Sequence, residues 1–355
     1  MNQFFPLVRF GLLLWMSFGT LCRAQEVWRV LPTGTSASLR GLYPIDRSTA
    51  WTCGSQATVL RTTDSGRSWT RCKIEGLDEK SELRSIHAWS ADEVVVATAG
   101  APCRIYSTKD AGITWKIVYE NEHPDAFIDG LRFWDKDRGF VFGDPIEQQL
   151  LSLVSQDRGQ SFRASCLEQY TLRPAEAGFA ASNSSLLVFD SESVWIGLGG
   201  ATGPAQVLMS DDGGRHWTRS DVDPIPASKS SGVFSLARSP EGQVIAVGGD
   251  YMQADKQEGN IALYDPQEKS WKKPNGTLPG GYRSSVIYLP ESIQLKLQGS
   301  VVRWICAGPN GCDASADANT WTAMSKQPFH ALAVAGDGSV WACGSQGRVG
   351  LLAFP

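Results

Sequence analysis

Seven segments of the chain share a pattern in which an apolar residue is followed by a variable residue and then by a small one. The variable position is arginine three times and aspartate and histidine once each, so it brings charge to an otherwise apolar or small motif. The segments are Leu39-Arg40-Gly41, Leu83-Arg84-Ser85, Ile128-Asp129-Gly130, Phe179-Ala180-Ala181, Val233-Phe234-Ser235, Tyr282-Arg283-Ser284 and Phe329-His330-Ala331. Arginine suits a carboxylate or sulfate, because its planar guanidinium donates two parallel hydrogen bonds. If these positions meet in space, they predict a site for an anionic group.

A second set of polar residues stands in loops rich in glycine and proline, which we expect at the same end of the fold. Together the two sets give ten candidate ligand-binding residues: Arg40, Arg84, Asp129, Asp144, Asn183, Asp250, Tyr251, Arg283, Asn310 and His330. We expect the arginines to bind the anion, His330 to add a donor whose charge follows pH, and Tyr251 to offer a stacking surface. Arg283 is the strongest candidate, because Gly280 and Gly281 give it an open approach. The alternative is that these charges only pair with one another.

The elements that would position these residues are indicated by four copies of another pattern, Ser/Thr-x-Asp-x-Gly followed by an aromatic residue three positions later. The aspartate of such a turn accepts backbone N–H groups, the glycine adopts positive φ, and the aromatic ring packs on neighbouring strands. The repeated residues are Asp64, Gly66 and Trp69; Asp110, Gly112 and Trp115; Asp157, Gly159 and Phe162; and Asp212, Gly214 and Trp217. We therefore assign these residues to structure and not to catalysis.

The spacing of the copies predicts the architecture. Their aromatic residues, with those of two degenerate copies ending at Trp271 and Trp321, lie 46–55 residues apart, which suits one four-stranded propeller blade. A seventh copy is divided between the termini, since the segment after Trp341 repeats the one after Trp51 and then lacks its outer strand. We expect residues near 26–31 to supply that strand. The sequence thus predicts an all-β, seven-bladed propeller of four-stranded antiparallel blades, forming a single domain over residues 26–355.

The four patterned turns resemble the Asp-box, or BNR repeat, of β-propeller proteins. With segments such as Val247-Gly248-Gly249-Asp250-Tyr251 and Gly281-Tyr282-Arg283-Ser284, the chain from 26 to 355 resembles the photosystem II stability/assembly factor-like branch of these propellers. That resemblance implies assistance to the assembly of membrane complexes through protein contact. Sialidases also carry Asp-boxes and three carboxylate-binding arginines, but the chain lacks their Phe-Arg-Ile-Pro-like segment and has seven expected blades instead of six.

The first 25 residues are typical of a signal peptide. Arg9 precedes an apolar run, Phe10–Phe18, and a small-residue cleavage site is expected near Ala24. The run is too short for a stable membrane span. We therefore expect an exported protein, periplasmic or secreted, whose mature chain has no transmembrane span. The formal net charge is −4 and the pI about 5.7, which gives no bulk electrostatic attraction to nucleic acid.

Cysteine and histidine spacing predicts neither a metal site nor a cofactor. No CxxC, CxxCH, HExxH or dinucleotide-binding glycine motif occurs in the sequence. Cleavage of the signal peptide would leave seven cysteines, of which Cys53, Cys306 and Cys343 follow a tryptophan in the pattern Trp-x-Cys. We expect most of them to be small buried strand residues. Cys306 and Cys312 are close enough in sequence to form a disulfide across a hairpin.

Three functions remain open from the sequence. A protein-binding assembly scaffold needs only the rigid disc and its faces, and a passive anion receptor needs only the arginines. A carbohydrate-active enzyme acting on an anionic glycan needs a pair of carboxylates, for which Asp129, Asp144 and Asp250 are candidates. We place the scaffold first and the glycan enzyme second, with a protein partner or an anionic glycan as the ligand.

Overall fold

The computed structural model describes Met1, residues 27–165 and residues 170–353. Residues 2–25 of the expected signal peptide, including the cleavage position near Ala24, lie outside this part of the chain. Cys22, Cys166 and the last two residues are also outside it.

The described chain forms seven four-stranded antiparallel sheets, and each sheet is one blade. The first strands of the blades are β2 (Leu39–Pro44), β6 (Glu82–Ala88), β10 (Ile128–Phe133), β14 (Leu186–Phe189), β18 (Ser231–Arg238), β22 (Ser285–Tyr288) and β28 (Ala331–Val334). The second strands are β3 (Ala50–Gly54), β7 (Val94–Ala99), β11 (Gly139–Ile146), β15 (Ser193–Leu198), β19 (Val244–Asp250), β25 (Trp304–Gly308) and β29 (Val340–Cys343).

The third strands are β4 (Thr58–Thr62), β8 (Cys103–Thr108), β12 (Gln149–Ser155), β16 (Gly203–Ser210), β20 (Ile261–Asp265), β26 (Gly311–Ser315) and β30 (Val349–Leu352). The outer strands are β5 (Thr70–Arg71), β9 (Lys116–Asn121), β13 (Arg163–Ala164), β17 (Thr218–Ala227), β21 (Ser270–Lys272), β27 (Trp321–Ser325) and β1 (Trp28–Leu31). A small hairpin of β23 (Lys296–Leu297) and β24 (Ser300–Val301), and the 3-10 helix η1 (Tyr251–Gln253), lie outside the blades.

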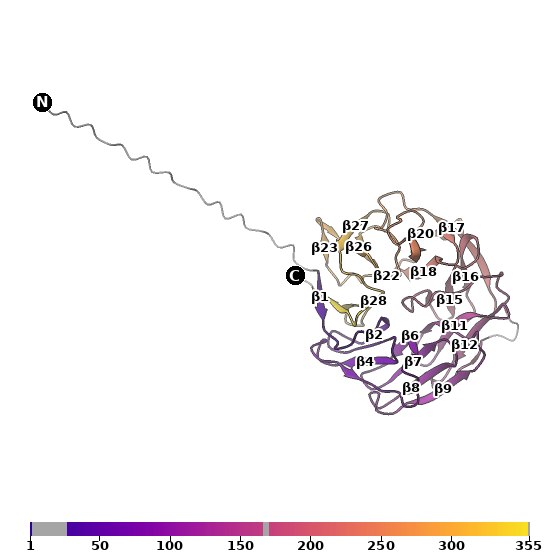
Figure 1. Ribbon diagram of the computed structural model, residues 1–355. Helices are drawn as coiled ribbons and strands as arrows, with labels where there is room; N and C mark the ends of the chain where they lie inside the picture. Colours follow the sequence, from indigo (N-terminus) through magenta and orange to yellow (C-terminus); the bar gives the residue numbers. More distant parts are fainter. Residues whose placement is uncertain (2–26, 166–169, 354–355) are drawn as a thin grey trace.

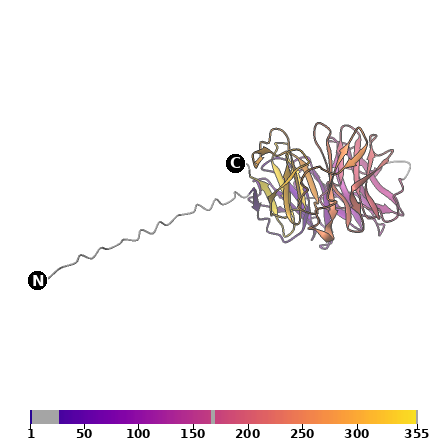
Figure 2. The ribbon, with the colours of Figure 1, turned by 90° about the horizontal axis from the view of Figure 1, so that it is seen from above.

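The blades form a closed ring, as the sequence predicts. Each first strand contacts the first strand of the next blade, and the last of them, β28, contacts β2. Figure 1 shows the blades arranged around a centre, and the view from above in Figure 2 shows a thick disc. The ring is closed by β1, which pairs antiparallel with β30 from Trp28 opposite Leu352 to Leu31 opposite Val349. The prediction that the N-terminal strand completes the last blade is therefore confirmed.

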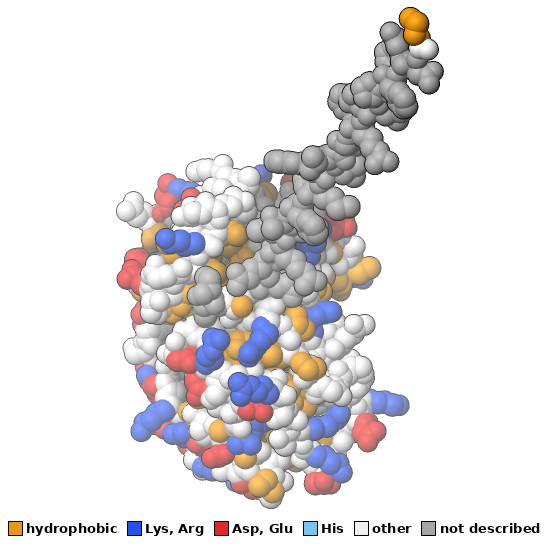
Figure 3. Space-filling model, turned by 90° about the vertical axis from the view of Figure 1, so that its left-hand side faces the viewer, with side chains coloured by type: hydrophobic (Ala, Val, Ile, Leu, Met, Phe, Trp, Pro, Cys, Tyr) orange, Lys and Arg blue, Asp and Glu red, His pale blue; other side chains and the backbone are white. Residues whose placement is uncertain are grey.

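The hydrophobic core is divided into clusters, each of which lies between two adjacent blades. One cluster joins the last blade to the first through Leu31 and Trp341 on one side and Leu39 on the other, and six similar clusters join the remaining pairs. Burial between sheets is the main source of stability in such an architecture, because each blade contacts only its neighbours. The side of the disc seen in Figure 3 carries side chains of both charges mixed over its surface, in keeping with the small net charge.

The Asp-box turns have the geometry that their sequence predicts. In the first, Asp64 Oδ1 accepts the N–H of Ser68 at 2.9 Å and Asp64 Oδ2 accepts its hydroxyl at 2.6 Å. Gly66 has φ +72°, and a Cβ there would lie 2.4 Å from Cδ1 of Leu31 in the closing strand. Each box also donates a backbone N–H to the loop between the first and second strands of its own blade, as Ser65 does to Ser48 O. The boxes thus hold each blade together and allow close approach to the preceding one.

A segment at residues 179–185, which we call the plug segment, crosses the central channel ahead of β14. The amide of Asn183 donates to the carbonyls of Ile86 and Leu131, in the two preceding blades, at 3.1 Å each. The hydroxyl of Ser182 donates to the carbonyl of Ser284, two blades further along the chain, at 2.7 Å. Because the plug segment bonds to first-strand residues on opposite sides of the ring, it divides the channel into two cavities.

The six cysteines in the described part of the chain are all buried and free. In the hairpin of β25 and β26, Cys306 lies opposite Asp313 and Cys312 lies opposite Ala307, so the two cysteines are offset by one pair. The disulfide considered from the sequence is therefore not formed. None of the described residues belongs to a helix whose length and apolar character would let it cross a bilayer.

Candidate functional site

A recurring β-bulge explains why the variable residues of the first strands turn away from their sheets. In four blades the register between the first and second strands shifts at the variable position, so no residue of the second strand lies opposite the variable residue. The four bulged residues are Arg40, Arg84, Asp129 and Phe234. A bulge adds one residue to one strand and redirects its side chain, which is why bulges are frequent beside binding sites.

Several of these residues meet at the end of the channel where the first strands begin, which we call the mouth. The mouth contains a pocket of about 370 Å³. Its lining residues are Arg40, Arg84, Phe179, Ala180, Ala181, Phe234, Tyr251, Tyr282, Pro309 and His330. Four of the ten candidates from the sequence, namely Arg40, Arg84, Tyr251 and His330, are therefore brought together here.

The two mouth arginines differ in their pairing. Arg84 forms an ion pair with Glu82 through Nε and Nη2, with the Nε bond at 2.7 Å, and its Nη1 lies 3.5 Å from the carbonyl of Ala180. Arg40 donates from Nη1 to the carbonyl of Ala181 at 3.4 Å and forms no ion pair within residues 27–165 and 170–353. Burial and the neighbouring charge of Arg84 lower the pKa of Arg40. Arg40 is thus a partly buried cation without a bound counter-charge.

The opposite wall of the mouth is aromatic. The rings of Phe179 and Phe234 stack with their centroids 4.0 Å apart, and Tyr282 meets Phe234 edge-on at 4.8 Å. Tyr251, at the start of η1, extends this cluster to the surface and is 46% exposed. Of this aromatic wall, the site proposed from the sequence included Tyr251 alone, although the other three members stand in the aligned first-strand segments.

His330 lines the mouth as a neutral group. Its Nε2 lies 2.8 Å from the hydroxyl of Ser345. Burial lowers the pKa of His330 to about 3, and the nearby charges of Arg40, Arg348 and Arg84 act in the same direction. The sequence predicts a donor whose charge follows pH; with its pKa lowered this far, the imidazole is neutral around pH 7, because desolvation and three cations disfavour the imidazolium.

Arg283, the strongest candidate from the sequence, lies away from the mouth pocket. It is 2% exposed and pairs with Asp313 on β26, with Nε and Nη2 both directed at Asp313 Oδ2; the Nε distance is 2.7 Å. In this blade the first strand begins only at Ser285, so Arg283 precedes the strand and turns into the blade. The structure thus assigns Arg283 to the alternative considered above, an internal ion pair.

Asp129 and Asp144 form a carboxyl pair below the mouth surface. Asp129 is 1% exposed, and neither of its oxygens has a hydrogen-bond partner of normal geometry in the described part of the chain. Burial, followed by the charge of Asp144, raises the pKa of Asp129. Asp144 accepts the N–H of Gly178 at 3.1 Å, just ahead of the plug segment. Neither residue lines the mouth pocket, and Asp144 lines a separate pocket of about 430 Å³.

The three remaining candidates make contacts that hold the structure together. Asn183 is 2% exposed and accepts the N–H of Leu131 at 2.8 Å in addition to its two donated bonds. Asp250 caps η1 by accepting the N–H of Met252 at 2.9 Å. The side-chain amide of Asn310 donates to Asp255 Oδ1 at 2.6 Å. None of the residues lining the described mouth pocket is a carboxylate, so the acid and base of a glycosidase are not found there.

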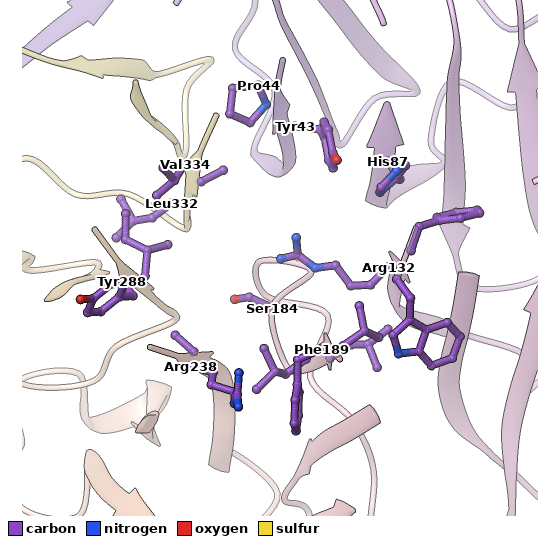
Figure 4. Close-up of a pocket in the computed structure, with 18 of the residues that line it drawn as sticks. Tyr43, Pro44, His87, Arg132, Ser184, Phe189, Arg238, Tyr288, Leu332 and Val334 are labelled. Carbon is purple, nitrogen blue, oxygen red and sulfur yellow. The ribbon is translucent and has the colours of Figure 1, made fainter. Parts of the chain in front are cut away.

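A larger cavity, of about 930 Å³, lies at the other end of the channel, where the first strands end (Figure 4). All seven first strands contribute to its walls, and we call it the distal cavity. Tyr43, His87 and Arg132 of this cavity each lie three residues beyond a variable position, and this spacing was the signal that sequence reasoning missed. No group of three or more histidine, cysteine, aspartate or glutamate residues suited to a metal ion occurs among the described residues.

Comparison with known proteins adds to this picture. A family model described as "Photosynthesis system II assembly factor YCF48" matches residues 22–128. No curated protein matches the sequence. Among solved structures, "YCF48 bound to D1 peptide" is 15% identical, with a TM-score of 0.65 over 93% of this chain and 97% of that one. YCF48 from Cyanidioschyzon merolae is 13% identical, with a TM-score of 0.58 over 92% and 98% of the two chains.

Other propellers share the fold at a similarly low sequence identity. The GH74 xyloglucanase from Xanthomonas campestris is 14% identical, with a TM-score of 0.61 over 91% of this chain and 53% of that one. Identities this low show the fold alone, so the likeness to the photosystem II assembly factors depends on the repeats and on the match over residues 22–128. The resemblance stated from the sequence is confirmed to this extent: residues 22–128 match the model of the photosystem II assembly factor family, and the described chain has the fold of a seven-bladed β-propeller.

Proposed function

We propose that the protein is an exported scaffold of the assembly type, and that its mouth binds an acidic segment of a partner protein. The observation that carries the proposal is Arg40, a partly buried guanidinium without an ion-pair partner among the described residues, in a pocket lined by a second arginine. A carboxylate placed there would supply the counter-charge that the protein leaves out, through a charge-assisted hydrogen bond. Removing such a contact commonly weakens binding substantially.

The aromatic wall supports a peptide as the ligand. Phe179, Phe234 and Tyr251 offer ring surfaces beside the arginines, so the pocket accepts an apolar or aromatic side chain next to an acidic one. A structure with this fold is titled "YCF48 bound to D1 peptide", and a peptide ligand for the present chain is in line with that precedent. Glycan cleavage is not part of the proposal, because Asp129 is buried and Asp250 caps η1.

Export is proposed from the signal-peptide pattern of residues 1–25 alone. It is tested by fractionating cells and sequencing the N-terminus of the protein recovered outside the cytoplasm. A mature chain that begins near Gln25 would support the proposal. Recovery of the full-length chain in the cytoplasm alone would contradict it.

The binding proposal is tested by fluorescence anisotropy with a labelled peptide of the composition Glu₄Trp and a matched Gln₄Trp peptide. We expect the glutamate peptide to bind more tightly, and Arg40→Met to weaken it by about tenfold or more, the equivalent of one charged hydrogen bond. Arg104→Met serves as the control, because Arg104, on the third strand β8, pairs with Glu120 on the outer strand β9 and does not line the mouth. Equal binding of the two peptides, or unchanged binding in Arg40→Met, would refute the proposal.

A further inference from the structure

The distal cavity has the size and composition of a ligand site. Its volume of about 930 Å³ falls within the range of small-molecule pockets. The plug segment separates it from the mouth: Ala181 O accepts Arg40 on the mouth side, whereas Asn183 O accepts Arg132 Nε at 3.0 Å on the distal side. The two cavities are therefore independent sites on one channel.

Two arginines in the distal cavity have no acidic partner among the described residues. Arg132 donates only from Nε, to Asn183 O, and Figure 4 shows its guanidinium directed toward the centre of the cavity. Burial lowers the pKa of Arg132, as expected of a cation without a counter-charge. Arg238 stacks over the ring of Phe189, with its guanidinium carbon 4.8 Å from the ring centroid. Stacking uses only the face of the guanidinium, so its N–H groups can still donate hydrogen bonds to an anion that lies in the guanidinium plane.

The other ionisable groups of the cavity wall do not neutralise these arginines. Asp135 is the one carboxylate that lines it within the described residues, and it is bonded to Arg138 Nε at 2.7 Å. Burial lowers the pKa of His87 to about 3, so its imidazole is neutral. Lys136 also lines the cavity, and burial raises the pKa of Tyr43, so its phenol is neutral too. The distal cavity is therefore positively charged.

The remaining wall is apolar and faces the cavity. Leu187, Val188, Ile287 and Val334 are only partly buried although they lie at the centre of the ring. Apolar side chains that remain exposed inside a concave site gain free energy when a ligand displaces water from them. A ligand that satisfies both features has an apolar body and an anionic head.

We propose that the distal cavity binds a small amphipathic anion, with its carboxylate or sulfonate between Arg132 and Arg238 and its apolar body against the walls of the neighbouring blades. The arginines approach from the third and fifth blades and the apolar residues from the fourth, sixth and seventh. Such a ligand would bridge the third and fifth blades, which are not adjacent in the ring. The site is separate from the peptide-binding mouth and does not depend on it.

The probe for this site is 8-anilinonaphthalene-1-sulfonate, whose fluorescence rises in apolar surroundings, with the uncharged N-phenyl-1-naphthylamine as its matched partner. We expect the sulfonate to bind the folded protein and decanoate to displace it. Arg132→Met and Arg238→Met should each weaken the sulfonate about tenfold or more and leave the neutral probe within about twofold. Arg132→Lys, which keeps the charge, should retain part of the affinity.

Arg104→Met, at an arginine that lines neither the mouth nor the distal cavity, is the matched control and should leave sulfonate binding unchanged. Thermal melting establishes whether each variant folds. Arg132→Met could fail to fold because Asn183 O loses the donor Arg132 Nε. In that case the sulfonate affinity of Arg238→Met tests the proposal. Sulfonate affinity that is unchanged in Arg238→Met, weakened as much in Arg104→Met as in Arg132→Met, or matched by the neutral probe would overturn the proposal. Affinity lost in Arg40→Met and kept in Arg238→Met would place the probe at the mouth and would also overturn it.

Discussion

At the scale of single residues, arginines on both sides of the plug segment are bonded to its carbonyl oxygens. Arg40 and Arg84 contact it from the mouth, and Arg132 contacts it from the distal cavity. Each uses one or a few N–H groups for this structural bond and leaves others available. The same side chains can therefore both hold the plug segment in place and bind an anion. A substitution of one of these arginines changes both roles at once, so the stability of each variant has to be measured separately from its binding.

Replacing Asp129 by asparagine should stabilise the protein at neutral pH. The pKa of Asp129 is raised in the folded state, so its contribution to stability is present below the ordinary pKa of 3.8 and is lost as the pH rises through the folded value. Asparagine is neutral at every pH and avoids the buried charge beside Asp144. We therefore expect the free energy of unfolding at pH 7.5 to rise above that of the parent.

The rise in the free energy of unfolding of Asp129→Asn over the parent should disappear below about pH 4, where the parent carboxyl is itself protonated. Chemical denaturation at pH 7.5 and pH 3.5 measures both values. Asp125→Asn, an exposed carboxylate on the same blade, is the control and should change neither. A variant that is less stable than the parent at pH 7.5 would show that Asp129 is ionised and bonded in the folded protein.

Two buried histidines should make the protein lose stability in mild acid. Burial lowers the pKa of both His87 and His330 to about 3 from the ordinary 6.5. Below pH 6.5 the unfolded chain binds protons that the folded one excludes, so stability falls as the pH decreases, by about 1.4 kcal/mol per pH unit for each histidine. His87→Phe should halve this slope between pH 6.5 and 4.5, since the ring contacts with Tyr43 and Phe133 remain possible.

The control for this measurement is His123→Gln, at a partly exposed histidine outside both cavities. It should leave the slope as it is in the parent. An unchanged slope in His87→Phe would mean that His87 takes up its proton within the folded protein.

At the scale of elements, the Asp-box turn should be a local stabilising unit without a role in binding. In Asp157→Ala the backbone N–H groups of Gln160 and Ser161, which Asp157 Oδ1 accepts at 3.0 Å each, lose their partner. We expect the free energy of unfolding to fall by about 1–2 kcal/mol. Both the glutamate peptide and the sulfonate probe should bind the folded variant as they bind the parent.

Asp223→Ala, an exposed aspartate on the outer strand β17, is the control for Asp157→Ala and should be close to neutral in stability. Denaturation curves of the two variants give the comparison. A folded Asp157→Ala protein that fails to bind the peptide would show that the box has a part in recognition.

The sequence predicts the blades well because each signal is local. A box turn makes its bonds within seven residues, as from Thr62 to Ser68, and the variable residue of each first strand is marked by its neighbours. The contacts that a polar or charged side chain makes are harder to predict, because its partners lie far along the chain. Arg283 turns to Asp313, thirty residues away, and Asn183 bonds to Ile86, ninety-seven residues away. No pattern in one sequence indicates such pairs, and the plug segment was missed for the same reason.

At the scale of the whole molecule, the ring is closed by a single short strand, so removing that strand should destabilise every blade. A chain that begins at Pro32 lacks β1, and with it Trp28 and Leu31, which are 1% and 5% exposed. Loss of one such tryptophan alone costs about 3–5 kcal/mol. The truncation also leaves β30 with an unpaired edge and opens the cluster between the last and first blades.

We therefore expect the melting temperature of this truncated protein to fall by about 10 °C or more, with increased aggregation, relative to a chain that begins at residue 27. The control removes a segment of similar length that belongs to no blade: residues 296–301, the hairpin of β23 and β24, replaced by two glycines. Because this hairpin closes nothing, its loss should lower the melting temperature far less. Equal melting temperatures for the Pro32 chain and the residue 27 chain would mean that contacts between blades hold the ring without its closing strand.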